Sequence, residues 1–125
     1  MYHTIWDLLQ KRPVNCRVDC GNVEIYLPDR REGKKPQTYN FIGHRAERII
    51  ERKIETMLHA ELHDELDEQR HRYGLEYLNI IFIFMQRYSI DSISEDALLK
   101  NYYRWRKALR RKKQRREYKK KWKKN

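Results

Sequence analysis

Glycine, cysteine and long apolar segments are all scarce in this chain of 125 residues. Its 4 glycines are scattered, which argues against the glycine-rich loops that cradle phosphates in nucleotide-binding enzymes. The longest apolar run, Ile80–Met85, is far shorter than the ~20 residues that cross a bilayer. The first ten residues are interrupted by polar ones and do not resemble a signal peptide. We therefore expect no membrane partner.

The 2 cysteines, Cys16 and Cys20, lie in a segment that we expect to be extended. Residues four apart in a strand are separated by ~13 Å, whereas a disulfide needs Cα atoms within ~7 Å. We expect free thiols and a reducing, cytoplasmic location. A zinc knuckle would need a second cysteine pair, which the sequence lacks. Alternation with polar residues predicts instead that both cysteines are small core residues.

Acidic residues are nearly missing from the end of the chain. The segment Lys100–Asn125 holds 15 Lys or Arg and 1 acid, Glu117. Since the whole chain carries +11 and this segment +14, residues 1–99 carry −3. A near-neutral body followed by a cationic block is typical of a protein that binds polyanions through the block.

Hydrophobic periodicity predicts a mainly α fold (α+β). We expect a short N-terminal helix and a β-hairpin, then about three helices, one of them long, and a basic C-terminal helical extension. The expected elements are a hairpin at about 14–27, a long helix at about 41–73, a helix at about 75–88 and a last helix from about 93. Residues 1–109 would form one small globular domain, and residues 110–125 a basic helical arm.

Local signals support these bounds. Val14 and Leu27 begin and end an alternation of apolar and polar residues, broken by a Gly21-Asn22 pair that suits a tight turn. The segment 79–85 has the composition of either helix or strand, and its length favours a helix that is buried on every side.

Two of the expected helices have marked ends and faces. Gly74 is a fitting end for the long helix. The expected apolar face of that helix consists of Ala46, Ile50, Ile54 and Met57 and continues with Leu58, Leu62 and Leu66. A capping box at Ser92, or Ser94 in its place, would begin the last helix. Along that helix one apolar face repeats at spacings of three and four, and it consists of Leu98, Tyr102, Trp105 and Leu109.

His59, His63 and Asp67 form a candidate metal site, because side chains four apart share one face of a helix. The zinc-protease motif needs Glu directly after its first histidine, and Ala60 stands there. Both histidines also lie opposite the expected apolar face, so we expect a solvated or partner-facing pair, no metal and no cofactor. The serines near residue 90 have a sufficient role as helix caps, and we expect no enzymatic activity.

The candidate binding site consists of the basic arm and the last turns of the helix that precede it. Arginine offers a planar fork for phosphates, and the interleaved aromatic residues suit stacking on bases or sugars. The expected nucleic-acid-binding residues are Arg104, Arg106, Lys107, Arg110, Arg111, Lys112, Lys113, Arg115, Arg116, Tyr118, Lys119, Lys120, Lys121, Trp122, Lys123 and Lys124.

These observations predict a non-enzymatic nucleic-acid-binding protein, with DNA slightly favoured over RNA and weak sequence specificity. It would be an accessory or architectural subunit of a larger complex. A helix-turn-helix arrangement of the last two helices is an alternative, but Glu95 and Asp96 at the start of the last helix would repel phosphates. A second hypothesis is a protein-interaction or oligomerisation module whose arm docks on an acidic partner. A third is a small histidine-dependent nuclease.

Overall fold

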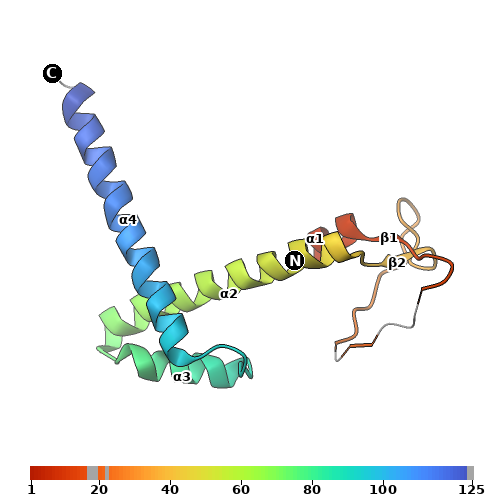
Figure 1. Cartoon of the computed structure of the whole chain (residues 1–125), viewed down its shortest axis with the longest axis horizontal. Coiled ribbons are helices and arrows are strands. Elements are labelled where there is room, and N and C mark those ends of the chain that lie inside the picture. Colours follow the sequence, from red (N-terminus) through yellow and green to blue (C-terminus); the bar gives the residue numbers. More distant parts are fainter. Residues whose placement is uncertain (17–19, 22, 124–125) are drawn as a thin grey trace. The chain divides into compact units, whose positions relative to one another are not determined.

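The computed structural model of the chain describes residues 1–16, 20–21 and 23–123 and is mainly helical (Figure 1). Its elements in chain order are helix α1 (Tyr2–Leu8), strands β1 (Gln10–Lys11) and β2 (Tyr39–Phe41), and helices α2 (His44–Tyr73), α3 (Tyr77–Arg87) and α4 (Glu95–Lys123). This architecture confirms the predicted fold class. The segment 79–85, for which helix and strand were both open, is helical.

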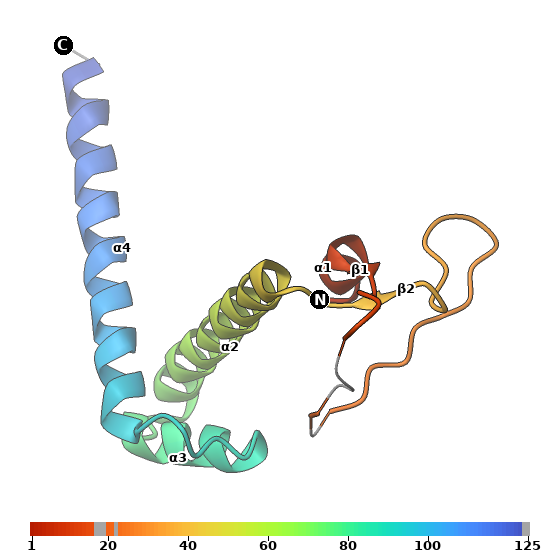
Figure 2. The ribbon, with the colours of Figure 1, turned by 45° about the vertical axis from the view of Figure 1, so that its right-hand side comes forward.

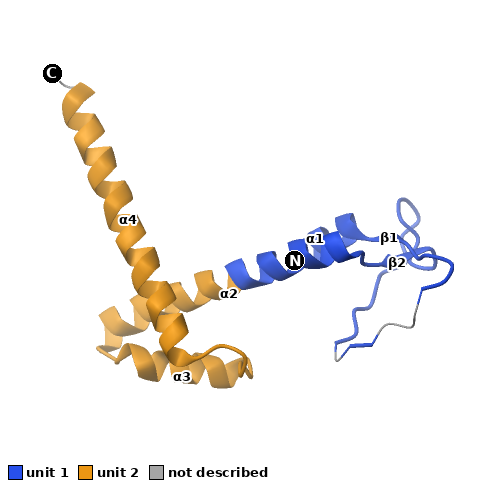
Figure 3. Cartoon of the chain, in the orientation of Figure 1, with its two compact units in different colours: residues 1–56 blue, residues 57–125 orange. Residues whose placement is uncertain are grey.

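Two compact units, residues 1–56 and residues 57–125, meet inside α2 (Figure 3). Each has buried residues of its own: Leu9 and Ala46 in the first unit, and a larger cluster in the second. The division by compactness therefore lies at residue 56, not at residue 109 where the sequence analysis ends the globular domain. That domain boundary stays a prediction.

The two strands of the first unit do not lie where the sequence predicts them. β1 pairs antiparallel with β2, in the register Gln10 to Phe41, so the pairing closes a long loop. Within 14–27 the described residues form no strand, and the predicted turn residue Asn22 lies outside the described residues. The predicted start of the long helix at Phe41 is also corrected, because Phe41 belongs to β2 and the helix begins at His44.

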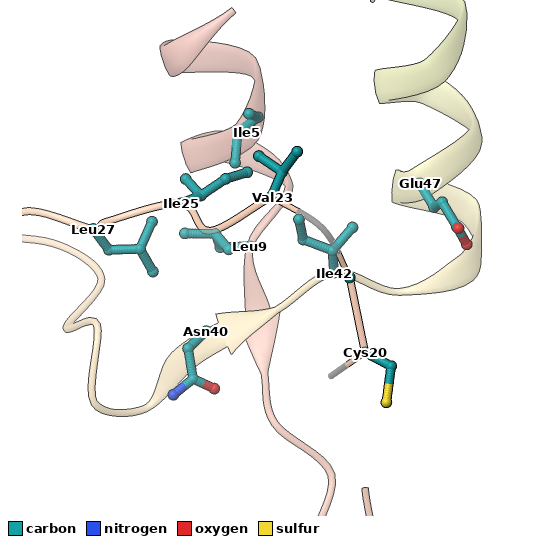
Figure 4. A pocket seen from close by; sticks show the side chains of 10 residues that line it. Ile5, Leu9, Cys20, Val23, Ile25, Leu27, Asn40, Ile42 and Glu47 are labelled. Carbon is teal, nitrogen blue, oxygen red and sulfur yellow. The ribbon is translucent and has the colours of Figure 1, made fainter. Parts of the chain in front are cut away.

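Three apolar residues from the second half of the predicted hairpin line an open cleft instead of pairing in a sheet. The cleft has a volume of about 520 Å³, and Figure 4 shows Val23, Ile25 and Leu27 beside Ile5 and Leu9. Alternation still places these three side chains on one side of the extended segment. They face α1 and β2, and the described residues of the segment pair with no strand. The alternation therefore reflects one side of an extended segment turned toward the cleft, and not a hairpin.

The cysteines are likewise less buried than expected. Neither forms a disulfide, as predicted, but Cys16 is half-buried and Cys20 is exposed. Val14 is fully exposed. Alternation alone therefore did not identify core residues here, since the described residues of the segment join no sheet that would give them a buried face.

Lys34 connects the long loop between β1 and β2 to the end of α1. Lys34 Nζ donates to the carbonyl oxygens of Trp6, Asp7 and Leu9 at 3.1, 2.8 and 2.9 Å. These acceptors include carbonyls at the C-terminal end of α1, where a cation also meets the negative end of the helix dipole. Arg30 lies over the Trp6 ring at 5.1 Å and adds a second cationic contact from the same loop.

The second unit is built around a core shared by α2, α3 and α4. Its buried side chains are Leu62, Leu66, Ile80, Ile81, Phe84, Leu98 and Tyr102. The prediction that α3 is buried on every side is wrong, because Leu78, Phe82 and Ile83 are 47%, 52% and 52% exposed. One side of α3 packs into the core, whereas the side with these three residues is apolar and exposed.

The histidine side of α2, and not the side of Met57, packs into this core. His63 is buried and His59 is half-buried, so the prediction of a solvated or partner-facing pair is wrong for His63. On the predicted apolar face, Leu62 and Leu66 are buried, whereas Ile54 and Met57 are about half exposed. As predicted, the histidine side and the Met57 side lie on opposite sides of α2. Packing of α4 decides which of them is covered, and the rings of His63 and Trp105 lie 4.6 Å apart.

The ends of the helices follow the local signals. α2 ends at Tyr73, and Gly74 adopts a φ of 63°, the left-handed conformation that favours glycine. Of the two caps considered for the last helix, Ser94 is the one in use. Its Oγ accepts the backbone N–H of Ala97 at 3.2 Å, and α4 begins at Glu95.

Candidate nucleic-acid interface

α4 is a single helix that begins in the core and continues beyond it. In Figures 1 and 2 its N-terminal part lies against α3 while the remainder extends away as an uninterrupted rod. At 1.5 Å per residue its 29 residues span about 43 Å. Leu98 and Tyr102 are buried, Trp105 is half-buried, and Leu109 is 44% exposed. The predicted apolar face therefore holds the helix to the core for its first three turns.

The basic side chains lie almost entirely on the part of α4 that has left the core. Every described residue from Lys107 to Lys123 is exposed. Glu117 is the one acid in this stretch. The positive charges are therefore solvated and close together, and they create a strong local potential toward anions.

Helical geometry divides these residues into two sides. At 100° per residue, five side chains fall within an arc of about 60° that faces away from Leu98 and Tyr102. We call this set the outward stripe, and it consists of Arg104, Arg111, Arg115, Tyr118 and Trp122. All five are exposed. This alignment was not predicted from the sequence, although the spacing of three, four and seven residues contains it.

The aromatic end of the stripe is open to solvent. Tyr118 and Trp122 are 61% and 67% exposed, and their ring centroids lie 5.9 Å apart at an interplanar angle of 53°. This tilt keeps the two rings from covering each other face to face. Beyond Leu109 these two are the only large apolar side chains in the sequence.

Arg106 differs from the other predicted binding residues. Its Nη1 donates to the Tyr77 hydroxyl at 3.0 Å, and its guanidinium lies 5.6 Å from the centre of the Tyr102 ring. The side chain is half-buried. Arg106 thus closes the edge of the core, and we assign it a packing role. Lys124 lies outside the described residues, and the other predicted binding residues are exposed.

His63 and Asp67, two of the three candidate metal ligands, serve the core. His63 Nε2 and Asn101 Oδ1 lie 3.0 Å apart, and the Tyr102 hydroxyl donates to Asp67 Oδ1. Burial lowers the pKa of His63, and burial together with the bond to Asp67 raises the pKa of Tyr102. No group of three potential ligands is arranged to hold a metal ion within the described part of the chain.

Comparisons with protein-family models, curated proteins and solved structures find no match to this chain. Of the helices in the described ranges, none is both long and apolar enough to cross a bilayer. The candidate interface thus rests on the chemistry and geometry of α4.

Proposed function

We propose that this chain is a non-enzymatic protein that binds nucleic acid by gripping phosphates with the exposed part of α4. The observation that carries the proposal is a continuous helix that leaves its core and whose exposed side chains beyond it are mostly cationic. Phosphate contacts of this kind supply affinity and little sequence information. We therefore expect weak sequence preference, with DNA slightly favoured over RNA, and an accessory or architectural role in a larger complex.

The start of α4 supports contacts through its far end. Glu95 and Asp96 occupy the first turn, and Asp96 forms an ion pair with Lys100 at 2.6 Å. A recognition helix that inserts its N-terminus into a groove would bring these carboxylates toward phosphates. A helix that lies along the backbone with its C-terminal half avoids that repulsion.

Two variants with equal net charge test the proposal. In the arm variant, Arg110, Arg111 and Lys112 are replaced with Gln. In the control variant, three exposed arginines of the first unit are replaced with Gln, namely Arg45, Arg48 and Arg52. Binding to labelled DNA and RNA is followed by fluorescence anisotropy. The arm variant should lose at least tenfold in affinity at 100 mM salt, about 1.4 kcal/mol, and the control less than twofold. Equal losses in both variants would show that net charge, not the arm, governs binding.

A second candidate function is protein interaction, and one observation favours it. The apolar side of α3 exposes Leu78, Phe82 and Ile83 together, although large apolar side chains are usually covered when they cluster. Sedimentation velocity of nuclease-treated protein at two salt concentrations distinguishes the candidates. An oligomer that forms without nucleic-acid affinity would favour interaction over binding of nucleic acid.

A further inference from the structure

We propose that the outward stripe prefers single-stranded nucleic acid, with unpaired bases stacked on Tyr118 and Trp122. This inference rests on the proposed function, because it specifies which form of nucleic acid the same surface takes. It starts from the position of the two rings. They are exposed, they are one helical turn apart, and they lie in line with Arg111 and Arg115 on the side of α4 that faces away from the core.

The two rings have no packing role in the described structure. Both lie well beyond Leu109, where the contact of α4 with the core has ended, and each keeps over 60% of its surface exposed. Their mutual contact is tilted, at 53°, so ring surface stays open to a flat partner. Two solvated aromatic rings on a cationic helix are therefore available to a ligand.

The chemistry of the stripe selects unpaired bases. In a duplex the faces of the bases are covered by their neighbours, so an exposed ring has no face to stack on. Single strands expose these faces, and stacking on aromatic side chains tolerates any base. Arg111 and Arg115 precede the rings by about one to three turns, where they can contact the phosphates of the same strand while the rings hold its bases.

An anionic membrane is the main competing partner for basic and aromatic side chains. A helix that lies in a membrane interface separates its polar side from its apolar side. Here Arg111 and Arg115 share one narrow arc with Tyr118 and Trp122. Burying the rings among lipid chains would bring both guanidinium groups toward the hydrocarbon, whereas a nucleic-acid strand offers phosphates and base faces to the same arc.

Replacing both rings with leucine tests the inference sharply. The Tyr118→Leu/Trp122→Leu variant keeps apolar area and helix propensity but removes the aromatic faces. Binding is measured to a thymidine oligonucleotide of about 15 residues, within known site sizes, and to a DNA hairpin duplex. Affinity for the oligonucleotide should fall about 5- to 150-fold for each ring lost, and affinity for the duplex less than twofold. The Phe pair, Tyr118→Phe/Trp122→Phe, should restore most of the single-strand affinity.

Matched controls separate the possible failures. Tyr73, 66% exposed at the end of α2, is replaced with leucine and should leave both affinities unchanged. If the parent binds neither nucleic acid, the proposed function itself fails. If the parent binds both but the leucine pair weakens them equally, or not at all, only the single-strand inference fails. Tighter binding to vesicles rich in anionic phospholipid than to the oligonucleotide would also overturn it.

Discussion

The two sides of α4 beyond the core should contribute unequally to binding, and equal changes of charge on each side can measure the difference. Arg111 and Arg115 lie on the outward stripe. Lys113 and Arg116 lie on the opposite side, in line with the core, and are equally exposed. The perturbation is replacement of one pair or the other with Gln, which lowers the net charge by two in both cases.

The magnitude follows from the number of cations that one side of the helix can present. Counted at 100° per residue, about seven basic side chains lie on the outward half of α4. Lys100 is already paired with Asp96, and the six that remain for phosphates are Arg104, Lys107, Arg110, Arg111, Arg115 and Lys121. Six phosphate contacts give a slope of log affinity against log salt of about −4 for single strands and about −5 for duplex. Affinity for a single strand should then fall about 300-fold between 50 and 200 mM salt.

The assay is anisotropy of a labelled single strand at four or more salt concentrations. Replacing Arg111 and Arg115 should reduce the steepness of the slope by about 1.4, and replacing Lys113 and Arg116 by less than about 0.5. Equal reductions for the two pairs would refute the argument that one side of the helix makes the contacts. A slope near zero for the parent would refute the phosphate mechanism altogether.

Three further predictions concern stability, measured by urea denaturation. Burial lowers the pKa of His63 below its ordinary value near 6.5. The unfolded state therefore binds more protons, and the free energy of unfolding should fall as the pH drops through and below about 6.5. The variant His63→Gln should lose this pH dependence, whereas His71→Gln, a change on the exposed side of α2, should retain it. Ser94→Ala should lower the free energy of unfolding by about 1 kcal/mol, because it removes the cap of α4. Ser92→Ala should lower it by less than about 0.5 kcal/mol, and equal losses would contradict the assignment of the cap. Ser89 adopts a φ of 50°, so Ser89→Gly should stabilise the chain by about 0.5–1 kcal/mol, and a loss of stability would show that the serine side chain matters more than the backbone.

The helices could be predicted from sequence because their signals are local. The glycine that ends α2, the serine cap and the apolar face of α4 each depend on residues within a few positions of one another. The pairing of β1 with β2 could not be predicted in this way. It joins Gln10 to Phe41 across a long loop, and no local turn marks it.

Burial of His63 escaped prediction for a related reason. A helix with residues of mixed polarity on two sides does not specify which side its neighbours will cover. Asn101 and Trp105 arrive from α4, nearly forty residues later in the chain, and they satisfy the imidazole by a hydrogen bond and a ring contact. The positive charge of the candidate site could be predicted from composition. Which basic residues of α4 face away from the core could be assigned only once the position of the core was known.

The unbroken course of α4 has a consequence for the way this protein evolves and is engineered. Because one helix serves both the core and the stripe, the packing of Tyr102 sets the rotational phase of Trp122, five and a half turns later. An insertion of one residue after Leu109 would turn everything beyond it by about 100° and direct the rings toward another side, whereas an insertion of seven residues would turn them by only about 20°. The arm can therefore change length only by insertions close to a whole number of turns, such as about 7, 11 or 18 residues, if its stripe is to keep its direction.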